Sequence, residues 1–160
     1  MKTPKPYNIP SADPYGGFVG EAPTMYMAAG RPLSLSGMTP LQKMQISKKG
    51  VSKNYLEQFK KATALGYDDL AGALAVTRAT LINKKGEEKF NTPLSERIVS
   101  LADLYAYGYE VFEDTEAFNQ WMQAPNQALG GLTPLSITDS LYGREEVKSL
   151  IGRIAYGVYS

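Results

Sequence analysis

Apolar residues recur at helical spacing along most of the chain after about residue 41, and no segment alternates apolar and polar side chains as a strand would. The longest apolar stripe follows Thr92-Pro93, a pair that suits an N-cap and the first position of a helix, and runs to Phe112. Ser52 is a plausible N-cap for another helix, which Gly66 is expected to end. Further short helices are predicted at 67–76 and 78–85, and around 115–122 and 144–154. The pattern predicts an all-α fold.

The first segment of the chain has a different composition from the rest. Residues 1–40 are rich in Pro, Gly, Ser and Met and show no sustained period, which is typical of an extended arm. We therefore expect three segments: the arm, a helical domain at 41–91, and a second helical domain at 92–160 that opens with the long helix.

Composition narrows the possible functions. The 160 residues are 43% hydrophobic and include no cysteine and no histidine. The chain therefore lacks the usual general base near neutral pH, the commonest metal ligand and any thiolate. We expect no enzyme activity, no metal site and no cofactor. The N-terminus has no apolar stretch of the signal-peptide kind, and no run approaches the roughly 18 apolar residues of a membrane helix, so we expect a cytoplasmic protein without a membrane partner.

Charge is unevenly divided along the chain. The net charge is only +1, but residues 1–91 carry 13 Lys+Arg against 7 Asp+Glu, a balance of +6. Residues 92–160 carry 4 against 9, a balance of −5. We call these two stretches the basic half and the acidic half. The asymmetry favours two surfaces with different partners, a polyanion for the first and a basic cleft for the second.

Two short helices of the basic half, joined by Leu74-Ala75-Val76-Thr77, have the spacing of a helix-turn-helix. Early polar residues of the second helix would reach base edges, and flanking lysines would contact phosphates. The turn carries Ala75 where glycine is frequent, which indicates a strained turn or a different turn type. The alternative is an ordinary helical bundle with solvated lysines. The candidate DNA-binding residues are Thr77, Arg78, Thr80, Asn83, Lys84 and Lys85. The further phosphate-contact candidates are Lys48, Lys49, Lys53, Lys60 and Lys61.

The acidic half carries a series of specific motifs, and its last twelve residues, "SLIGRIAYGVYS", are unusually apolar. The motifs are Trp121, Pro125-Asn126, Ala128-Leu129-Gly130-Gly131, Thr133-Pro134-Leu135, Gly143, Val147, Arg153-Ile154 and Tyr156-Gly157. In these positions the chain resembles the toxin-binding domain of the Xre/MbcA/ParS-type antitoxins. The segment before it is similar to their Xre-like DNA-binding domain, so the resemblance spans about residues 50–160.

The resemblance implies an antitoxin of a type II toxin-antitoxin system. Its partner would be a RES-domain toxin that consumes NAD or modifies proteins with it, and the C-terminal domain would block that enzyme's active site. The N-terminal domain, as a homodimer, would bind operator DNA and repress its own operon. The acidic half fits an electropositive dinucleotide pocket, and the aromatic tail supplies rigid anchors. The candidate toxin-binding residues are Arg153, Tyr156, Gly157, Val158, Tyr159 and Ser160.

Two other classes of function stay open. One is a solitary helix-turn-helix regulator of transcription whose C-terminal half only dimerises or senses a ligand; a co-purifying second protein separates it from the antitoxin. The other is a small histidine-free enzyme, which requires a deep pocket lined by paired Asp or Glu.

Overall fold

The computed structural model describes residue 35 and residues 37–157. Within these ranges every regular element is helical, and the only strand-like pairing is an isolated bridge between Ser52 and Lys89, so the all-α prediction is confirmed. The elements in chain order are α1 (Pro40–Lys49), α2 (Lys53–Thr63), α3 (Tyr67–Leu74), α4 (Arg78–Ile82), α5 (Thr92–Phe112), α6 (Thr115–Gln123), the 3-10 turns η2 (Gln127–Leu129) and η3 (Leu135–Ile137), and α7 (Leu141–Ala155).

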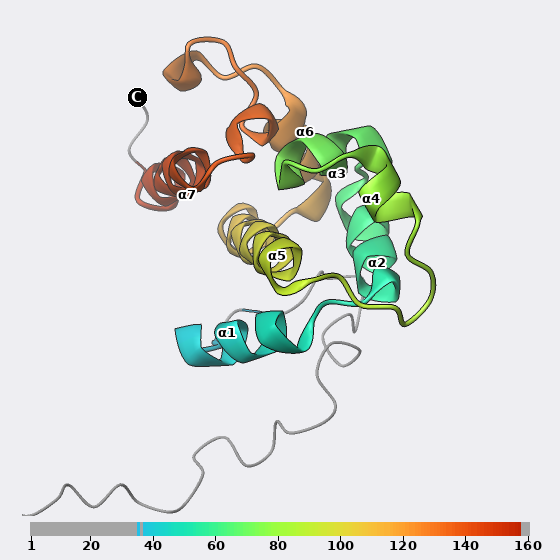
Figure 1. Ribbon diagram of the computed structural model, residues 1–160. Coiled ribbons are helices and arrows are strands. Elements are labelled where there is room, and N and C mark those ends of the chain that lie inside the picture. The colour runs from blue at the N-terminus through green and yellow to red at the C-terminus, as the bar shows by residue number, and fades with distance from the viewer. Residues whose placement is uncertain (1–34, 36, 158–160) are drawn as a thin grey trace, which may run out of the picture.

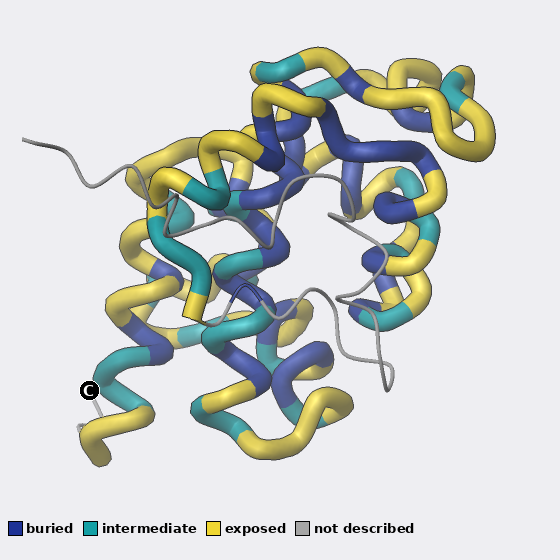
Figure 2. The backbone as a smooth tube through the Cα atoms, turned by 90° about the horizontal axis from the view of Figure 1, so that it is seen from below, coloured by how far each residue is buried: buried dark blue, intermediate teal, exposed yellow. Residues whose placement is uncertain are grey.

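The long helix α5 forms the centre of the molecule. It contacts α1, α2, α3, α6 and α7, and Figure 1 shows these helices arranged around it. Helices from both halves of the chain bury their apolar faces against α5 in one continuous cluster, visible as the dark blue interior in Figure 2. The basic half and the acidic half therefore share a core, so neither half buries its apolar faces alone.

Aromatic rings fix the position of α6 on α5. Phe118 is fully buried and lies edge-on to Tyr105 and Tyr109, with ring centroids 5.3 and 5.4 Å away. Trp121 stacks on Phe118 with ring centroids 5.7 Å apart, so Trp121 has a structural role in the packing of α6. The ring of Phe118 fits because Gly108 on α5 has no side chain: an added Cβ would lie 2.0 Å from the Phe118 Cζ atom.

Several helix boundaries differ from the sequence prediction, among them the end of α2 and the start of α5. Gly66 does not end α2: the helix stops at Thr63, and Ala64 takes the left-handed conformation with φ 56°. Gly66 instead precedes α3, where its N–H donates to the Asp69 carboxylate. The N-cap of α5 is Asn91, one residue before the predicted Thr92, because the Asn91 side chain accepts a hydrogen bond from the Leu94 N–H in the first turn of the helix.

Candidate functional site

The connection between α3 and α4 is a short, well-bonded turn. Ala75 follows α3 in the left-handed conformation, φ 54°, and the Val76 N–H donates to the Ala71 carbonyl at 3.0 Å. The Thr77 side chain then accepts a hydrogen bond from the Thr80 N–H and begins α4. Alanine thus adopts the conformation that glycine usually provides in such a turn, at a cost of about 1 kcal/mol.

The six candidate DNA-binding residues lie on α4 or next to it, and none of them is buried. Arg78 is exposed and lies 3.4 Å from Asp68 at the start of α3, an ion pair that solvent screens strongly. The hydroxyl groups of Thr77 and Thr80 are 2.8 Å apart and bonded to each other. Because Thr77 also caps α4, part of its hydrogen-bonding capacity stabilises the helix.

Helix α4 ends earlier than the sequence pattern predicts, because the following segment pairs with α2. The N–H groups of Lys53 and Asn54, which open α2, donate to the carbonyls of Glu88 and Gly86 at 2.9 Å. A helix start leaves such N–H groups without intrahelical partners, so this pairing satisfies them. Helix α4 therefore ends at Ile82, and Asn83 is its C-cap. Two candidate residues lie in the turn rather than on the helix: Lys84 and Lys85.

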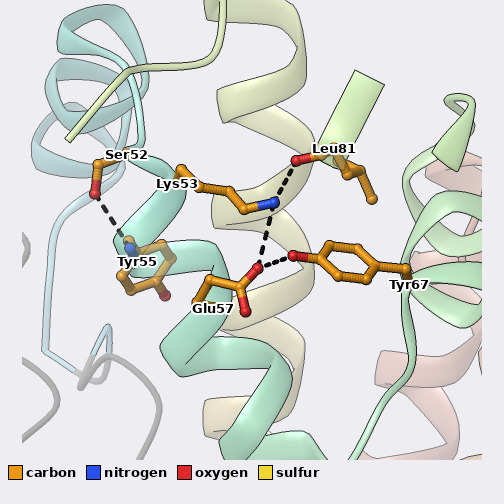
Figure 3. A network of polar contacts seen from close by, with 6 residues as sticks. All are labelled: Ser52, Lys53, Tyr55, Glu57, Tyr67 and Leu81. Atoms are coloured by element: carbon orange, nitrogen blue, oxygen red, sulfur yellow. Dashed lines mark hydrogen bonds and ion pairs between the residues drawn. The ribbon is translucent and has the colours of Figure 1, made fainter. Parts of the chain in front are cut away.

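Lys53 does not have the place expected of a phosphate contact. Its side chain is only 8% exposed, and its ammonium nitrogen donates to the Leu81 carbonyl at 2.5 Å. The same nitrogen lies 3.3 Å from a Glu57 carboxylate oxygen. Figure 3 shows these contacts converging between α2 and the end of α4. A lysine held in this way is not available to DNA, so the prediction for Lys53 is wrong.

Arg97 links the acidic half to the helix-turn-helix, a role that the sequence alone did not reveal. Its guanidinium Nη1 donates to the Leu74 carbonyl at 3.2 Å and lies 3.5 Å from the Ala75 carbonyl. These are the last carbonyls of α3, where a positive charge is favourable to the helix dipole. The turn before α4 is therefore held from α5.

Arg144 lies in the first turn of α7, close to the contact between the acidic half and the helix-turn-helix. Its Nη1 atom donates to the Thr138 carbonyl at 2.7 Å, just after η3, and η3 in turn contacts α3. Its Nε atom is buried without a hydrogen-bond partner. Burial, followed by the nearby charge of Arg97, lowers the pKa of the Arg144 guanidinium. The contacts of η3 bring the acidic half directly onto the first helix of the helix-turn-helix.

The motifs of the acidic half form a turn around Asn126 and a close contact between α7 and η3. The Asn126 side chain accepts from the Ala128 N–H at 2.9 Å, and the Asn126 carbonyl accepts from the Gly131 N–H at 2.9 Å. Asn126 therefore has a structural role in this turn. Gly143 lies against η3 so closely that an added Cβ would be 1.6 Å from the Ile137 carbonyl oxygen. These residues shape the domain, because their contacts are internal.

The predicted toxin-binding residues lie at and beyond the end of α7. Arg153 is half-buried and pairs with Glu146 at 3.1 Å. Tyr156 is 85% exposed, and Gly157 is in the left-handed conformation with φ 68°. An exposed tyrosine of this kind is available to a partner. The last three candidates, Val158, Tyr159 and Ser160, lie outside the described residues.

The described surface has shallow clefts. A cleft of about 460 Å³ is lined by uncharged side chains and Glu116, and a smaller one of about 200 Å³ lies between α1, α5 and α7. No group of three potential metal-ligating side chains occurs among the residues that the structure describes. In the same residues, no helix is both long enough and apolar enough to cross a bilayer.

Comparison with known proteins shows which protein domain the acidic half resembles. A family model described as the antitoxin Xre/MbcA/ParS C-terminal toxin-binding domain matches residues 108–157, from the last turn of α5 to the end of α7. Residues 108–157 are therefore similar to the toxin-binding domain of the Xre/MbcA/ParS antitoxins. The resemblance expected from the motifs is confirmed, and the Xre/MbcA/ParS domain comprises α6, η2, η3 and α7 on the end of the central helix.

Two relatives extend the similarity beyond the Xre/MbcA/ParS domain. The Prs ADP-ribosylating antitoxin of Sphingobium sp. is 27% identical over 133 residues, which cover 76% of this chain and 83% of that protein. The antitoxin Xre of Photorhabdus laumondii is 36% identical over 76 residues, which cover 47% of this chain and 51% of that one. This chain thus matches most of the first relative and about half of the second. Both relatives are antitoxins by name.

Proposed function

We propose that the protein is a cytoplasmic, non-catalytic antitoxin that neutralises a RES-type toxin and represses the operon encoding both. The observation that carries the proposal is the match of residues 108–157 to a toxin-binding domain. ADP-ribosylation, named for the Sphingobium relative, requires NAD as donor, and this supports an NAD-consuming partner enzyme. The acidic half would cover the entrance to that enzyme's active site.

The charge of the acidic half supports its binding at the active-site entrance of the toxin. The acidic side chains of the Xre/MbcA/ParS domain point into solvent, and the half that contains them has a net charge of −5. A pocket that binds the pyrophosphate of NAD requires positive potential, so the two surfaces are complementary and attract each other during encounter. The exposed acidic residues of this surface are Glu113, Asp114, Glu116, Asp139, Glu145 and Glu146.

The end of α7 is the part of this surface that we assign to the toxin's active-site entrance. Tyr156 projects from the helix end with most of its ring in solvent, and burying such a ring in a partner pocket is worth on the order of 1.5–3 kcal/mol before ordering costs. Arg153 and Gly157 lie beside it, and the proposal extends through the last three residues. The residues assigned to this contact are Arg153, Tyr156, Gly157, Val158, Tyr159 and Ser160.

We assign operator binding to the helix-turn-helix in the basic half. The exposed side chains of α4 and of the following turn include an arginine and an asparagine, which suit guanine and adenine edges, and two lysines, which suit phosphates. The protein would act on DNA as a homodimer, because paired half-sites double the contacts that one short helix makes. The residues assigned to DNA are Thr77, Arg78, Thr80, Asn83, Lys84 and Lys85.

Two variants separate these activities. The double variant Arg78→Ala with Asn83→Ala removes base contacts and should abolish operator binding while leaving toxin neutralisation intact. Deletion of residues 156–160 should have the opposite effect. Operator binding is measured by fluorescence anisotropy with promoter DNA, and neutralisation by growth of cells that express the toxin. Each variant serves as the control for the other, and equal damage to both activities by both changes contradicts the two-surface proposal.

The solitary-regulator alternative has one supporting observation, the helix-turn-helix geometry itself. It predicts that the tagged protein purifies without a second polypeptide and still binds its promoter. The antitoxin proposal predicts a stable complex with the enzyme encoded beside it.

A further inference from the structure

The side chain of Lys53 contacts residues of three helices at once: its own helix α2, and α3 and α4 of the helix-turn-helix. Its ammonium lies 2.5 Å from the Leu81 carbonyl at the end of α4 and 3.3 Å from Glu57, one turn further along α2. It also lies 4.6 Å from the ring centre of Tyr67, the first residue of α3. The Tyr67 hydroxyl donates to Glu57 and closes the network shown in Figure 3.

Burial of an ammonium group is costly unless its charge and its N–H donors are satisfied. Lys53 meets this condition through one carboxylate, one carbonyl and one aromatic face, which come from α2, α4 and α3 respectively. The network is therefore strongly dependent on geometry, since a shift of any of the three helices leaves a buried charge or carbonyl without its partner. An incidental surface lysine would not impose this dependence.

Helix α4 needs such an external support. It has five residues, and a helix of this length is not stable alone in water. The side chain of Leu81 is fully buried, which fixes one point of α4 in the core. The Leu81 carbonyl, at the negative end of the helix dipole, accepts from Lys53 and fixes a second point. Two fixed points determine how α4 is oriented on α2 and α3, and the exposed side chains of α4 take their direction from this orientation.

We propose that Lys53 is a positioning residue for DNA binding: with Glu57 and Tyr67 it sets the orientation of α4, and it makes no phosphate contact itself. This inference rests on the operator binding proposed above for α4. It assigns to a lysine of the basic half a role opposite to the one that its charge suggests, and it gives an acidic residue, Glu57, a favourable part in binding a polyanion.

Salt dependence distinguishes a positioning lysine from a phosphate contact. Each phosphate contact releases counterions, so its removal lowers the slope of log affinity against log salt by about 1. We expect Lys53→Met to weaken promoter binding about tenfold while leaving this slope unchanged. Lys85→Met, in the exposed turn, should lower the slope. Lys148→Met on α7 removes an equal charge far along the chain and should leave affinity within twofold. A lower slope for Lys53→Met overturns the inference.

Glu57 provides the sharpest test, because the two explanations predict opposite signs. If only long-range charge matters, Glu57→Gln removes a negative charge and strengthens DNA binding. If Glu57 positions α4 through Lys53 and Tyr67, Glu57→Gln weakens binding, and Tyr67→Phe weakens it as well although no charge changes. Stronger binding by Glu57→Gln overturns the inference. Because Glu57→Gln and Tyr67→Phe keep Lys53, they test the inference even if Lys53→Met does not fold.

Amide hydrogen exchange tests the positioning independently of DNA. The Asn83 N–H donates to the Ala79 carbonyl at the end of α4, so its exchange reports local opening of this helix. We expect Glu57→Gln and Tyr67→Phe to speed this exchange at least tenfold while α7 amides stay unchanged. If the wild-type protein binds no promoter DNA, the proposed function fails, yet faster exchange still supports the positioning network. Unchanged exchange at Asn83 contradicts the network itself.

Discussion

Gly108→Ala is expected to destabilise the protein even though alanine favours helices. The new Cβ would lie 2.0, 2.2 and 2.5 Å from three atoms of the Phe118 ring, whereas carbon atoms in contact are normally about 3.5–4.0 Å apart. The ring must therefore move by roughly 1.5 Å. It cannot do so freely, because Tyr105, Tyr109 and Trp121 lie against it.

The magnitude follows from two opposing effects. Overpacking a core costs typically 1–3 kcal/mol, and the three close atoms on a fully buried ring place this case at about 3. Replacing glycine with alanine inside a helix contributes about 1 kcal/mol in the favourable direction. The free energy of unfolding should therefore fall by about 2 kcal/mol, which lowers Tm by about 4–8 °C for a chain of this size.

Urea unfolding followed by circular dichroism measures this change, and fluorescence of the single tryptophan, Trp121, reports locally because it stacks on Phe118. Gly72→Ala is the matched control: Gly72 also lies within a helix, but an added Cβ meets nothing within 4 Å, so this variant should gain about 0.5–1 kcal/mol. A Gly108→Ala protein as stable as wild type would show that α6 does not pack on α5 as described.

The remaining predictions concern other buried groups. Asn119→Ala should lower the free energy of unfolding by about 1–2 kcal/mol, because it removes the hydrogen bonds of Asn119 to the Tyr109 hydroxyl and the Ala62 carbonyl of α2, which keep only their 3.3 Å bond to each other; urea titration measures it. Ala75→Gly should raise the free energy of unfolding by about 0.5–1 kcal/mol, because glycine adopts the left-handed conformation without strain; urea titration measures this change as well. Burial raises the pKa of Tyr55, Tyr105 and Tyr109. The free energy of unfolding is therefore unaffected by these groups below pH ~10 and should fall above it by about 1.4 kcal/mol per pH unit for each tyrosine. In an alkaline titration, tyrosinate absorbance should appear together with unfolding.

A specific result would contradict each of these three predictions. Asn119→Ala with unchanged stability would mean that its hydrogen bonds are replaced by water. A destabilised Ala75→Gly would mean that the turn is not left-handed. Tyrosinate absorbance from the three buried residues before the loss of helical signal would mean that solvent reaches them in the folded state.

Periodicity and capping residues were enough to predict the helical class and most helices. The stripe from Leu94 to Phe112 is long and begins beside a proline, so its helix follows directly from local rules. The apolar stripe of α2 likewise predicts its buried side. These elements depend on residues close together in the sequence, and local rules suffice for them.

Tertiary contacts decided the features that the sequence did not predict. Lys53 reads as one more basic residue until the end of α4 is placed beside it. The early end of α4 depends on backbone pairing between residues 86–88 and the start of α2, which no propensity describes. Arg97 lies 23 residues after Leu74 in the sequence, and only the fold brings its guanidinium to the carbonyls at the end of α3. Charge patterning alone therefore misassigned one lysine of the basic half.

The central claim is that this chain protects cells from an NAD-consuming enzyme. The most direct measurement is the cellular NAD level when the neighbouring toxin gene is expressed alone, with the full-length chain, or with the chain lacking residues 156–160. The antitoxin account predicts normal NAD and growth only with the full-length chain, and a fall in NAD in the other two cases. NAD that stays the same whether or not the chain is present would contradict the account.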